Sequence, residues 1–337
     1  MWTDQRNIIK KLSFRRLWNL YGLYSSYLMA KYLKKVKSKG LPFAASIEPT
    51  TACNLGCPEC PSGLKQFTRP TGRLDLDVHE NMLNQLGRQL FYINYYFQGE
   101  PFLHPEFLTL IRAAHRRKIY TATSTNAHFI TEKKAEEIVA SGLDRMIISI
   151  DGLTQETYEQ YRVRGKLEKV IKGTEQMVAA KKRLKSKTPH LIFQFLVVRP
   201  NEHEVDDVFI LGKKMGVDEV RLKTAQLYDY KNGNLLMPEN EKYARYKKMK
   251  DGTYKSKYSL SNHCWRMWSS TVLTWDGKVV PCCFDKDAKH VLGDVTKTDF
   301  SKIWKHSRYQ AFRKQIFTNR SEIDICKNCS EGAKVWT

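Results

Sequence analysis

Three closely spaced cysteines are the residues of this chain with the clearest chemical potential. Cys53, Cys57 and Cys60 stand in the spacing C-x3-C-x2-C, directly after the apolar run 43–47. Three thiolates so placed can hold three irons of a 4Fe–4S cube and leave the fourth iron open to a chelating ligand. A zinc site usually has four protein ligands, or three and a water, and seldom this spacing. The spacing favours a cube over a zinc knuckle or a group of buried thiols.

A second group of cysteines lies near the other end of the chain. Cys264 and Cys282 enclose a glycine in the pattern C-x12-G-x4-C, and that glycine belongs to an Asp-Gly pair at 276–277. The pair separates β-rich runs at 271–275 and 278–281, which predicts a hairpin that brings the two cysteines together.

Two further cysteines complete this second group. Cys326 and Cys329, spaced C-x2-C, add two thiolates, so four ligands are available for a second cube or, from spacing alone, for zinc. Cys283 is left over and is predicted to be a small buried side chain.

Length and composition indicate a globular intracellular protein. The chain has 337 residues, of which 42% are apolar, enough for one large domain or two ordinary ones. No run approaches the roughly 20 apolar residues of a membrane span, and no secretory signal is visible. We therefore expect a cytoplasmic location, with the cysteines as metal ligands in a reducing, low-oxygen compartment.

The charge is strongly positive, at a formal +22. Such a balance favours an anionic partner, whether nucleic acid, phospholipid or an acidic substrate. Residues 1–40 hold ten Lys/Arg and a single acidic residue, interleaved with aromatic and aliphatic residues, and are expected to form one or two helices. They either lie on an anionic membrane surface or pack on the outside of the main domain.

Residues 43–225 alternate β-rich runs with helical stretches. The expected strands are Ala44–Glu48, Phe91–Phe97, Tyr120–Ser124, Arg145–Ile150, Leu191–Val198 and Glu219–Lys223. The expected helices cover 77–89, 105–117, 131–141, 166–184 and 203–215. This alternation predicts an α/β fold in which six parallel strands form a partial (β/α)6 barrel, with active residues at the C-terminal ends of the strands.

Four short motifs follow these strands. They are Gln98-Gly99-Glu100-Pro101, Ser124-Thr125-Asn126, Ser149-Ile150-Asp151-Gly152 and Tyr161-Arg162-Val163-Arg164-Gly165. Glycine lets a backbone approach a ligand closely, and an arginine fork suits a carboxylate. Taken in this order behind the cysteine loop, the motifs resemble those of the radical S-adenosylmethionine (SAM) superfamily.

The resemblance implies a SAM site. The SAM-binding residues it implies are Gln98, Gly99, Glu100, Pro101, Ser124, Asn126, Ser149, Asp151 and Arg162. Arg162 would pair with the SAM carboxylate. Glu59 departs from the family pattern, in which an aromatic residue often precedes the third cysteine, so the adenine contact is not carried over and Glu59 is free to reach a backbone amide or the substrate.

The second cysteine group resembles the SPASM/Twitch extension of this superfamily. There Cys264, Cys282, Cys326 and Cys329 would hold one auxiliary 4Fe–4S cube, and Gly293-Asp294-Val295 and Ile303-Trp304 would lead into a helix ending near 317. The layout is similar to the shortened Twitch domain of the 2-deoxy-scyllo-inosamine dehydrogenase family. The expected domains are an extension (1–42), the barrel (43–228), a linker with a short helix (229–260) and the cluster domain (261–337).

The resemblance also implies a chemistry. A reduced first cube would cleave SAM to a 5′-deoxyadenosyl radical that takes hydrogen from a substrate, with electrons from a flavodoxin- or ferredoxin-type donor. The auxiliary cube would act as electron acceptor or relay.

The favoured reaction is oxidation of an alcohol on a small molecule or lipid head group, for which Lys223 and Tyr228 are candidate bases. Maturation of a ribosomal peptide is one alternative, and chemistry on a membrane-associated anionic substrate is another. A basic metal-binding protein for nucleic acid is an alternative of another class. No nucleic-acid-binding motif is visible, so nucleic acid is not the expected partner.

Overall fold

A curved sheet of nine strands forms the centre of the computed structural model, which describes residues 2–330. Six strands are parallel and follow one another in chain order. They are β1 (Ala44–Ile47), β2 (Tyr92–Asn94), β3 (Tyr120–Thr125), β4 (Arg145–Ser149), β5 (His190–Val197) and β6 (Glu219–Thr224). The predicted α/β fold with a (β/α)6 partial barrel is confirmed.

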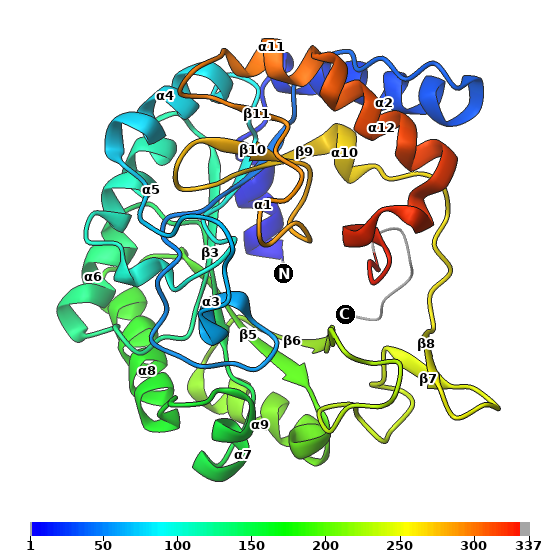
Figure 1. The fold of residues 1–337 in the computed structure, drawn as a ribbon. Helices are drawn as coiled ribbons and strands as arrows, with labels where there is room; N and C mark the ends of the chain where they lie inside the picture. Colours follow the sequence, from blue (N-terminus) through cyan, green and yellow to red (C-terminus); the bar gives the residue numbers. More distant parts are fainter. Residues whose placement is uncertain (1, 331–337) are drawn as a thin grey trace.

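Helices between the strands cover the outer face of the sheet (Figure 1). They are α4 (Leu76–Leu86), α5 (Phe107–Arg116), α6 (Glu132–Ala140), α8 (Leu167–Arg183) and α9 (Val205–Met215). Short helices α3 (Pro61–Leu64) and α7 (Gln155–Tyr161) were not expected from the sequence. Because helices cover one face and the barrel interior the other, β4 and most of β3 and β5 are buried on both sides.

The C-terminal hairpin joins the barrel sheet instead of standing apart from it. Strand β9 (Ser270–Leu273) runs parallel to β1, and β10 (Lys278–Val280) and β11 (Gly293–Asp294) extend the sheet beyond it. The boundary expected at residue 261 remains a prediction, but the sheet crosses it.

The rest of the C-terminal segment is helical. Helix α10 (Arg266–Ser269) precedes β9, and α11 (Phe300–Lys305) and α12 (Ser307–Asn319) follow β11. The single helix expected to end near 317 is therefore two helices, separated at His306, whose extended backbone begins α12.

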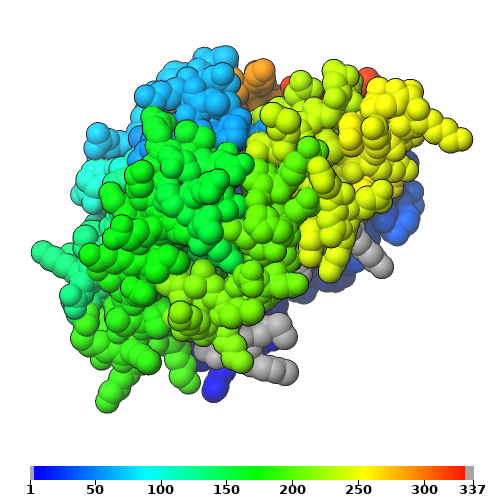
Figure 2. Space-filling model, turned by 90° about the horizontal axis from the view of Figure 1, so that it is seen from below, coloured from blue at the N-terminus to red at the C-terminus, as the bar shows by residue number. Residues whose placement is uncertain are grey.

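The segment 229–258 differs from its prediction. It contains no helix, and its only regular structure is an antiparallel pair, β7 (Tyr246–Lys248) with β8 (Tyr254–Ser256). The expectation of a short helix was wrong, because Gly233, Pro238 and Gly252 interrupt the polar stretch with turns. The segment projects from one side of the molecule, in yellow (Figure 2).

Helix α1 (Trp2–Lys10) closes the N-terminal end of the barrel, in the middle of the ring of strands (Figure 1). Asp4 pairs with Arg145 and accepts a hydrogen bond from the Tyr120 hydroxyl, at the first residues of β4 and β3. Asn7 Nδ2 donates to Asp144 Oδ1 at 2.8 Å. The N-terminal residues thus pack on the barrel, at the end opposite the cysteine loop.

Helix α2 (Phe14–Leu33) covers α10 and the start of the cluster domain. Its buried face includes Leu23, Tyr27 and Ala30, and the Tyr27 ring meets Trp265 and Trp268 at centroid distances of 5.2 and 5.6 Å. No helix among residues 2–330 has both the length and the apolar character needed to cross a bilayer.

Candidate functional site

The loop after β1 carries the first three cysteines at the C-terminal end of the barrel. Cys57 is buried, and Cys53 and Cys60 are half-buried. The loop is held by the Gly56 N–H, which donates to Val163 O at 2.9 Å, and by α3, where a Cβ on Gly63 would lie 2.6 Å from the Cys57 nitrogen. The backbone therefore brings the cysteines together, as the sequence predicts.

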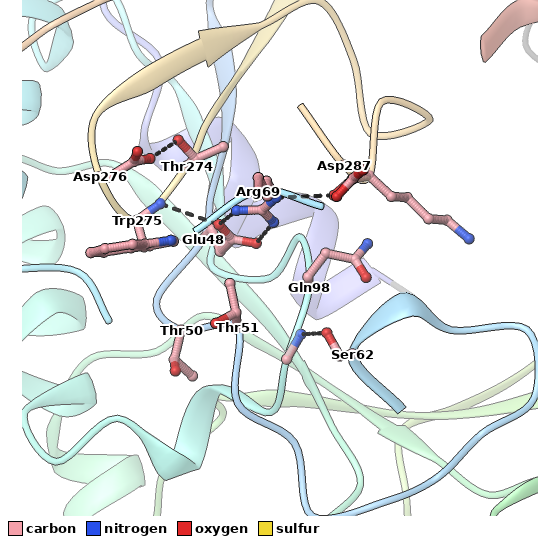
Figure 3. Close-up of polar contacts among 12 residues, drawn as sticks. Glu48, Thr50, Thr51, Ser62, Arg69, Gln98, Thr274, Trp275, Asp276 and Asp287 are labelled. Atoms are coloured by element: carbon pink, nitrogen blue, oxygen red, sulfur yellow. Dashed lines mark hydrogen bonds and ion pairs between the residues drawn. The ribbon is translucent and has the colours of Figure 1, made fainter. Parts of the chain in front are cut away.

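Gly99 brings the second predicted motif against this loop. Its φ is +74°, and a Cβ there would lie 2.2 Å from Thr50 O, so only glycine fits. Its N–H donates to Ser62 Oγ at 2.8 Å (Figure 3). The preceding Gln98 is buried near Cys60. The turn is thus fixed on the cysteine loop from two sides.

Glu100 fixes the position of the next motif. Its carboxylate accepts from Thr125 Oγ1 at 2.7 Å and from the Asn126 N–H at 2.8 Å. Burial nevertheless raises the pKa of Glu100 above its usual value. Asn126 Nδ2 in turn donates to Asn54 Oδ1 at 2.8 Å, inside the cysteine loop. Two of the predicted motifs and the loop therefore form one hydrogen-bonded unit.

Arg162 and Asp151 face each other beside Cys57. Arg162 Nε donates to Asp151 Oδ2 at 2.5 Å, and Arg162 Nη1 lies 3.7 Å from Cys57 Sγ. The other oxygen of Asp151 accepts from the Leu196 N–H at 2.7 Å. Ser149 is buried at the end of β4. Arg162 is thus next to the thiols, and its pairing with a SAM carboxylate stays a prediction.

The second group of four cysteines surrounds one enclosed cavity. Cys264, Cys282, Cys326 and Cys329 all line it. Arg320 Nη2 donates to Cys329 Sγ at 3.5 Å, and its Nη1 donates to His263 O at 2.6 Å. The hairpin prediction that joined Cys264 to Cys282 therefore agrees with the structure.

Cys283 differs from its prediction. It is half-buried, not buried, and Arg266 Nη1 lies 3.5 Å from its sulfur. The residue packs beside Phe97, Val272 and Val280 on the inner side of the hairpin. The reason is its place in the turn after β10, where Cys282 lines the enclosed cavity and Cys283 does not.

Both groups of thiols fit iron–sulfur clusters. Each is a set of soft sulfur donors with an arginine N–H directed at a sulfur. Across residues 2–330, no three His, Cys, Asp or Glu side chains converge closely enough to hold a single metal ion, and a cube is wider and needs its thiolates farther apart. Cys53, Cys57 and Cys60 would hold the first cluster and the other four cysteines the second.

An ion pair that the sequence did not reveal lies where the barrel meets the hairpin. Arg69 Nη1 and Nη2 donate to the two oxygens of Glu48, at 2.9 and 2.6 Å, and the Trp275 N–H donates to the same carboxylate at 3.2 Å (Figure 3). Glu48 is 0% exposed, and burial raises its pKa. The sequence signal that could have indicated this pair is the position of the Glu48 carboxylate directly after an apolar strand.

The two candidate bases have different surroundings. Lys223 is exposed to solvent at the C-terminal end of β6, yet enough protein surrounds it that desolvation lowers its pKa. Desolvation raises the pKa of Tyr228, which keeps its phenol protonated and so unable to accept a proton. The Tyr228 N–H donates to Glu59 Oε2 at 2.8 Å, so Glu59 does reach a backbone amide. Of the two, only Lys223 is shifted toward the form of a base.

Comparison with known proteins agrees with this geometry. The radical SAM superfamily model matches residues 47–209, and the model of the SPASM iron–sulfur cluster-binding domain matches residues 264–330. The PqqA peptide cyclase of Gluconobacter oxydans is 24% identical over 319 residues, 88% of this chain and 84% of the cyclase.

A second relative and a solved structure are also similar to this chain. The S-adenosyl-L-methionine-dependent 2-deoxy-scyllo-inosamine dehydrogenase of Niallia circulans is 22% identical over 289 residues, 84% of this chain and 91% of that protein. The crystal structure of BtrN in complex with AdoMet and 2-DOIA superposes with a TM-score of 0.55 and 20% identity, covering 87% of this chain and 94% of BtrN.

The chain contains a radical SAM domain over residues 47–209 and a C-terminal SPASM domain over residues 264–330. It is a radical SAM enzyme, and its two domains imply SAM and two 4Fe–4S clusters as cofactors. The roles of its individual SAM-binding residues stay predictions.

Proposed function

We propose that the protein oxidises an alcohol group of a small molecule or lipid head group. The observation that carries this proposal is the set of four thiols around one enclosed cavity. Four protein ligands leave a cluster no open position for substrate, which suits an electron acceptor. The similarity to a dehydrogenase also supports oxidation as the reaction.

Different residues of the protein have different roles in such a reaction. When bound, the first cluster with SAM supplies a radical able to take hydrogen from an unactivated C–H bond. Cys53, Cys57 and Cys60 hold that cluster, and Gly99 lets the backbone come close to it. Lys223, whose pKa is lowered by desolvation, accepts the proton of the alcohol oxygen.

A second candidate is peptide maturation, which the likeness to the PqqA peptide cyclase favours. The two candidates differ in what stimulates SAM cleavage. Anaerobic enzyme with dithionite and SAM is offered polyols, aminocyclitols and phospholipid head groups in one set and peptides in another, and 5′-deoxyadenosine is measured. We expect stimulation by the first set. Stimulation by peptides alone would replace the proposed function with the second candidate.

A Lys223→Met variant refines this test. With the stimulating compound, oxidised product should fall by roughly 10²-fold, the usual contribution of a general base. Lys213→Met is the matched control, because it removes an exposed lysine from the outer helix α9. Equal loss in the two variants would show that Lys223 has no specific part in the reaction.

We also propose that α2 rests on an anionic membrane surface. Phe14, Trp18 and Tyr21 are 82%, 66% and 66% exposed. The Phe14 and Trp18 rings stack at 6.3 Å, and the Trp18 and Tyr21 rings are tilted to each other at 5.7 Å. Arg15 and Lys31 flank this aromatic stripe. Aromatic side chains among lysines and arginines are suited to the lipid–water interface.

Vesicle co-sedimentation tests this contact. The enzyme should sediment with vesicles that contain phosphatidylglycerol and remain in solution with phosphatidylcholine alone. Phe14→Ser with Trp18→Ser should abolish sedimentation, whereas the control Phe209→Ser with Ile210→Ser, which removes exposed apolar side chains from α9, should not. Equal sedimentation of all forms would disprove a specific role of α2.

The electron donor in this proposal is a flavodoxin- or ferredoxin-type protein. Such donors are usually acidic, and a chain with a formal charge of +22 attracts them electrostatically. Reduction by such a donor should weaken steeply as salt rises, and a rate independent of salt would contradict the electrostatic argument.

A further inference from the structure

A pocket of about 740 Å³ opens between the two groups of cysteines. Its walls come from the cysteine loop, from the segment after β6 and from the C-terminal cluster domain. Glu59, which lines it, precedes Cys60, and Asn328, which also lines it, precedes Cys329. Its volume is that of a small-molecule site.

Most acidic side chains of this pocket are already occupied. Four of them accept hydrogen bonds: Glu59 from the Tyr228 N–H, Asp285 from the His290 N–H, Asp287 from the Thr68 N–H, and Asp324 from the His290 ring. These contacts fix the carboxylates in the walls of the pocket, and Glu59 still acts electrostatically on Lys286 without forming an ion pair with it.

Among the residues described, the lysine side chains of the pocket have no such hydrogen-bond partners. Lys231, Lys286, Lys289 and Lys327 line the pocket, and within residues 2–330 none of their ammonium groups has a hydrogen-bond or ion-pair partner. Lys286 is half-buried, with Nζ 4.7 Å from the centre of the Tyr228 ring. An ammonium held over an aromatic ring still has N–H donors on its far side for a ligand.

A buried arginine adds to the positive potential. Arg245 is 5% exposed and donates from Nη2 to the backbone oxygen of Asn328 at 2.7 Å. Its Nε is buried and has no hydrogen-bond partner in the described chain. Desolvation lowers the pKa of Lys286 and of Lys223, Cys283 opposes that shift in both, and Arg245 adds a smaller lowering, so the three cations lie within each other's field.

We propose that this pocket binds the substrate by an anionic group, a phosphate or a carboxylate, which Lys286 holds directly and Lys231 and Arg245 attract. The inference rests on the proposed function, because it names the class of substrate for that site. An anion there is held beside Glu59 and the first cysteine group, so the rest of the molecule extends toward the place where hydrogen is removed. Unpaired cations in a partly desolvated pocket bind such groups more strongly than surface lysines do.

Calorimetric titration of the reconstituted enzyme tests the inference. Pyrophosphate is the probe for phosphates and citrate the probe for carboxylates, so the two arms identify the preferred anion. We expect wild type to bind at least one probe and Lys286→Gln to bind it roughly tenfold more weakly, the effect of losing one charge-assisted hydrogen bond. Lys286→Arg should keep most of the affinity.

The matched control is Lys172→Gln, which removes one exposed lysine from the outer helix α8. Absence of binding in wild type, or equal weakening in the control, would overturn the inference. If Lys286→Gln loses its clusters, the exposed Lys231→Gln variant is titrated instead, and it should also bind the probe more weakly than wild type. Formation of 5′-deoxyadenosine by wild type is measured in the same preparation, so a missing anion site is distinguished from a failure of the proposed function.

Discussion

Replacement of Arg69 by methionine is the most informative perturbation of the fold. The guanidinium makes two hydrogen bonds to Glu48, at 2.9 and 2.6 Å, and its Nε donates to Lys286 O at 3.3 Å. Methionine keeps apolar contact near Phe67 and Phe97, over whose rings the guanidinium lies. Glu48 would retain only the Trp275 N–H, at 3.2 Å.

The expected cost is large because the carboxylate cannot reach water. Glu48 is 0% exposed, and removal of one partner from a buried ion pair typically costs about 3–5 kcal/mol. At roughly 2 °C per kcal/mol for a chain of this size, the apparent Tm should fall by roughly 6–10 °C. The control is Lys134→Met, which breaks an exposed pair with Glu137 and should cost less than about 1 kcal/mol.

The effect should also depend on pH. Burial raises the pKa of Glu48, and Arg69 opposes this shift, so the pKa rises further in the variant. The folded variant then binds a proton that the unfolded chain has released, and its stability falls as pH rises through that window. The difference in Tm from wild type should therefore be larger at pH 8 than at pH 6.

Scanning calorimetry of reconstituted protein at one fixed scan rate measures both effects, with iron content checked for every variant. An Arg69→Met variant that melts within 2 °C of wild type, or whose loss is the same at both pH values, would refute the argument that this pair is a buried link between barrel and hairpin.

The remaining predictions concern the site and its support. Gly99→Ala should reduce SAM affinity at least roughly tenfold, because the new side chain strains the backbone and overlaps Thr50 O. The control Gly252→Ala, at φ +83° with open space around it, should leave SAM affinity unchanged. Equilibrium dialysis measures SAM binding by both variants. Arg16→Met removes hydrogen bonds to four backbone oxygens and should lower the Tm by several degrees, and an unchanged Tm would show that α2 needs no such anchor. Activity should fall as pH drops below the lowered pKa of Lys223, and a flat profile would exclude it as the base.

The barrel was largely predictable because its strands are short β-rich runs that alternate with helical stretches, and β3, β4 and β5 are mostly buried on both faces. Five of six strands begin and end within one residue of the prediction, and only the second is much shorter, ending at Asn94 instead of Phe97. The pairing of β9 with β1 was not predictable, because a local pattern indicates a hairpin but not its neighbour in the sheet.

The site was predictable where spacing carries the chemistry. Local spacing predicted that the first three cysteines lie together, as well as the two pairs Cys264 with Cys282 and Cys326 with Cys329. Tertiary packing brings the two pairs to one cavity, which all four cysteines line. The Glu48–Arg69 pair was missed because 21 residues separate its members and no periodic pattern joins them. The contacts of α1 with Arg145 and Asp144 were missed for the same reason, since a basic helix is equally typical of a membrane surface.

Anaerobic reconstitution with iron and sulfide, followed by dithionite and SAM, tests the central claim most directly. Wild type should contain about eight irons and release 5′-deoxyadenosine, detected by mass spectrometry. The Cys53→Ala, Cys57→Ala, Cys60→Ala triple variant should retain about half the iron and release none. Undiminished release by that variant, or a wild type that binds zinc and takes up no iron, would contradict the account.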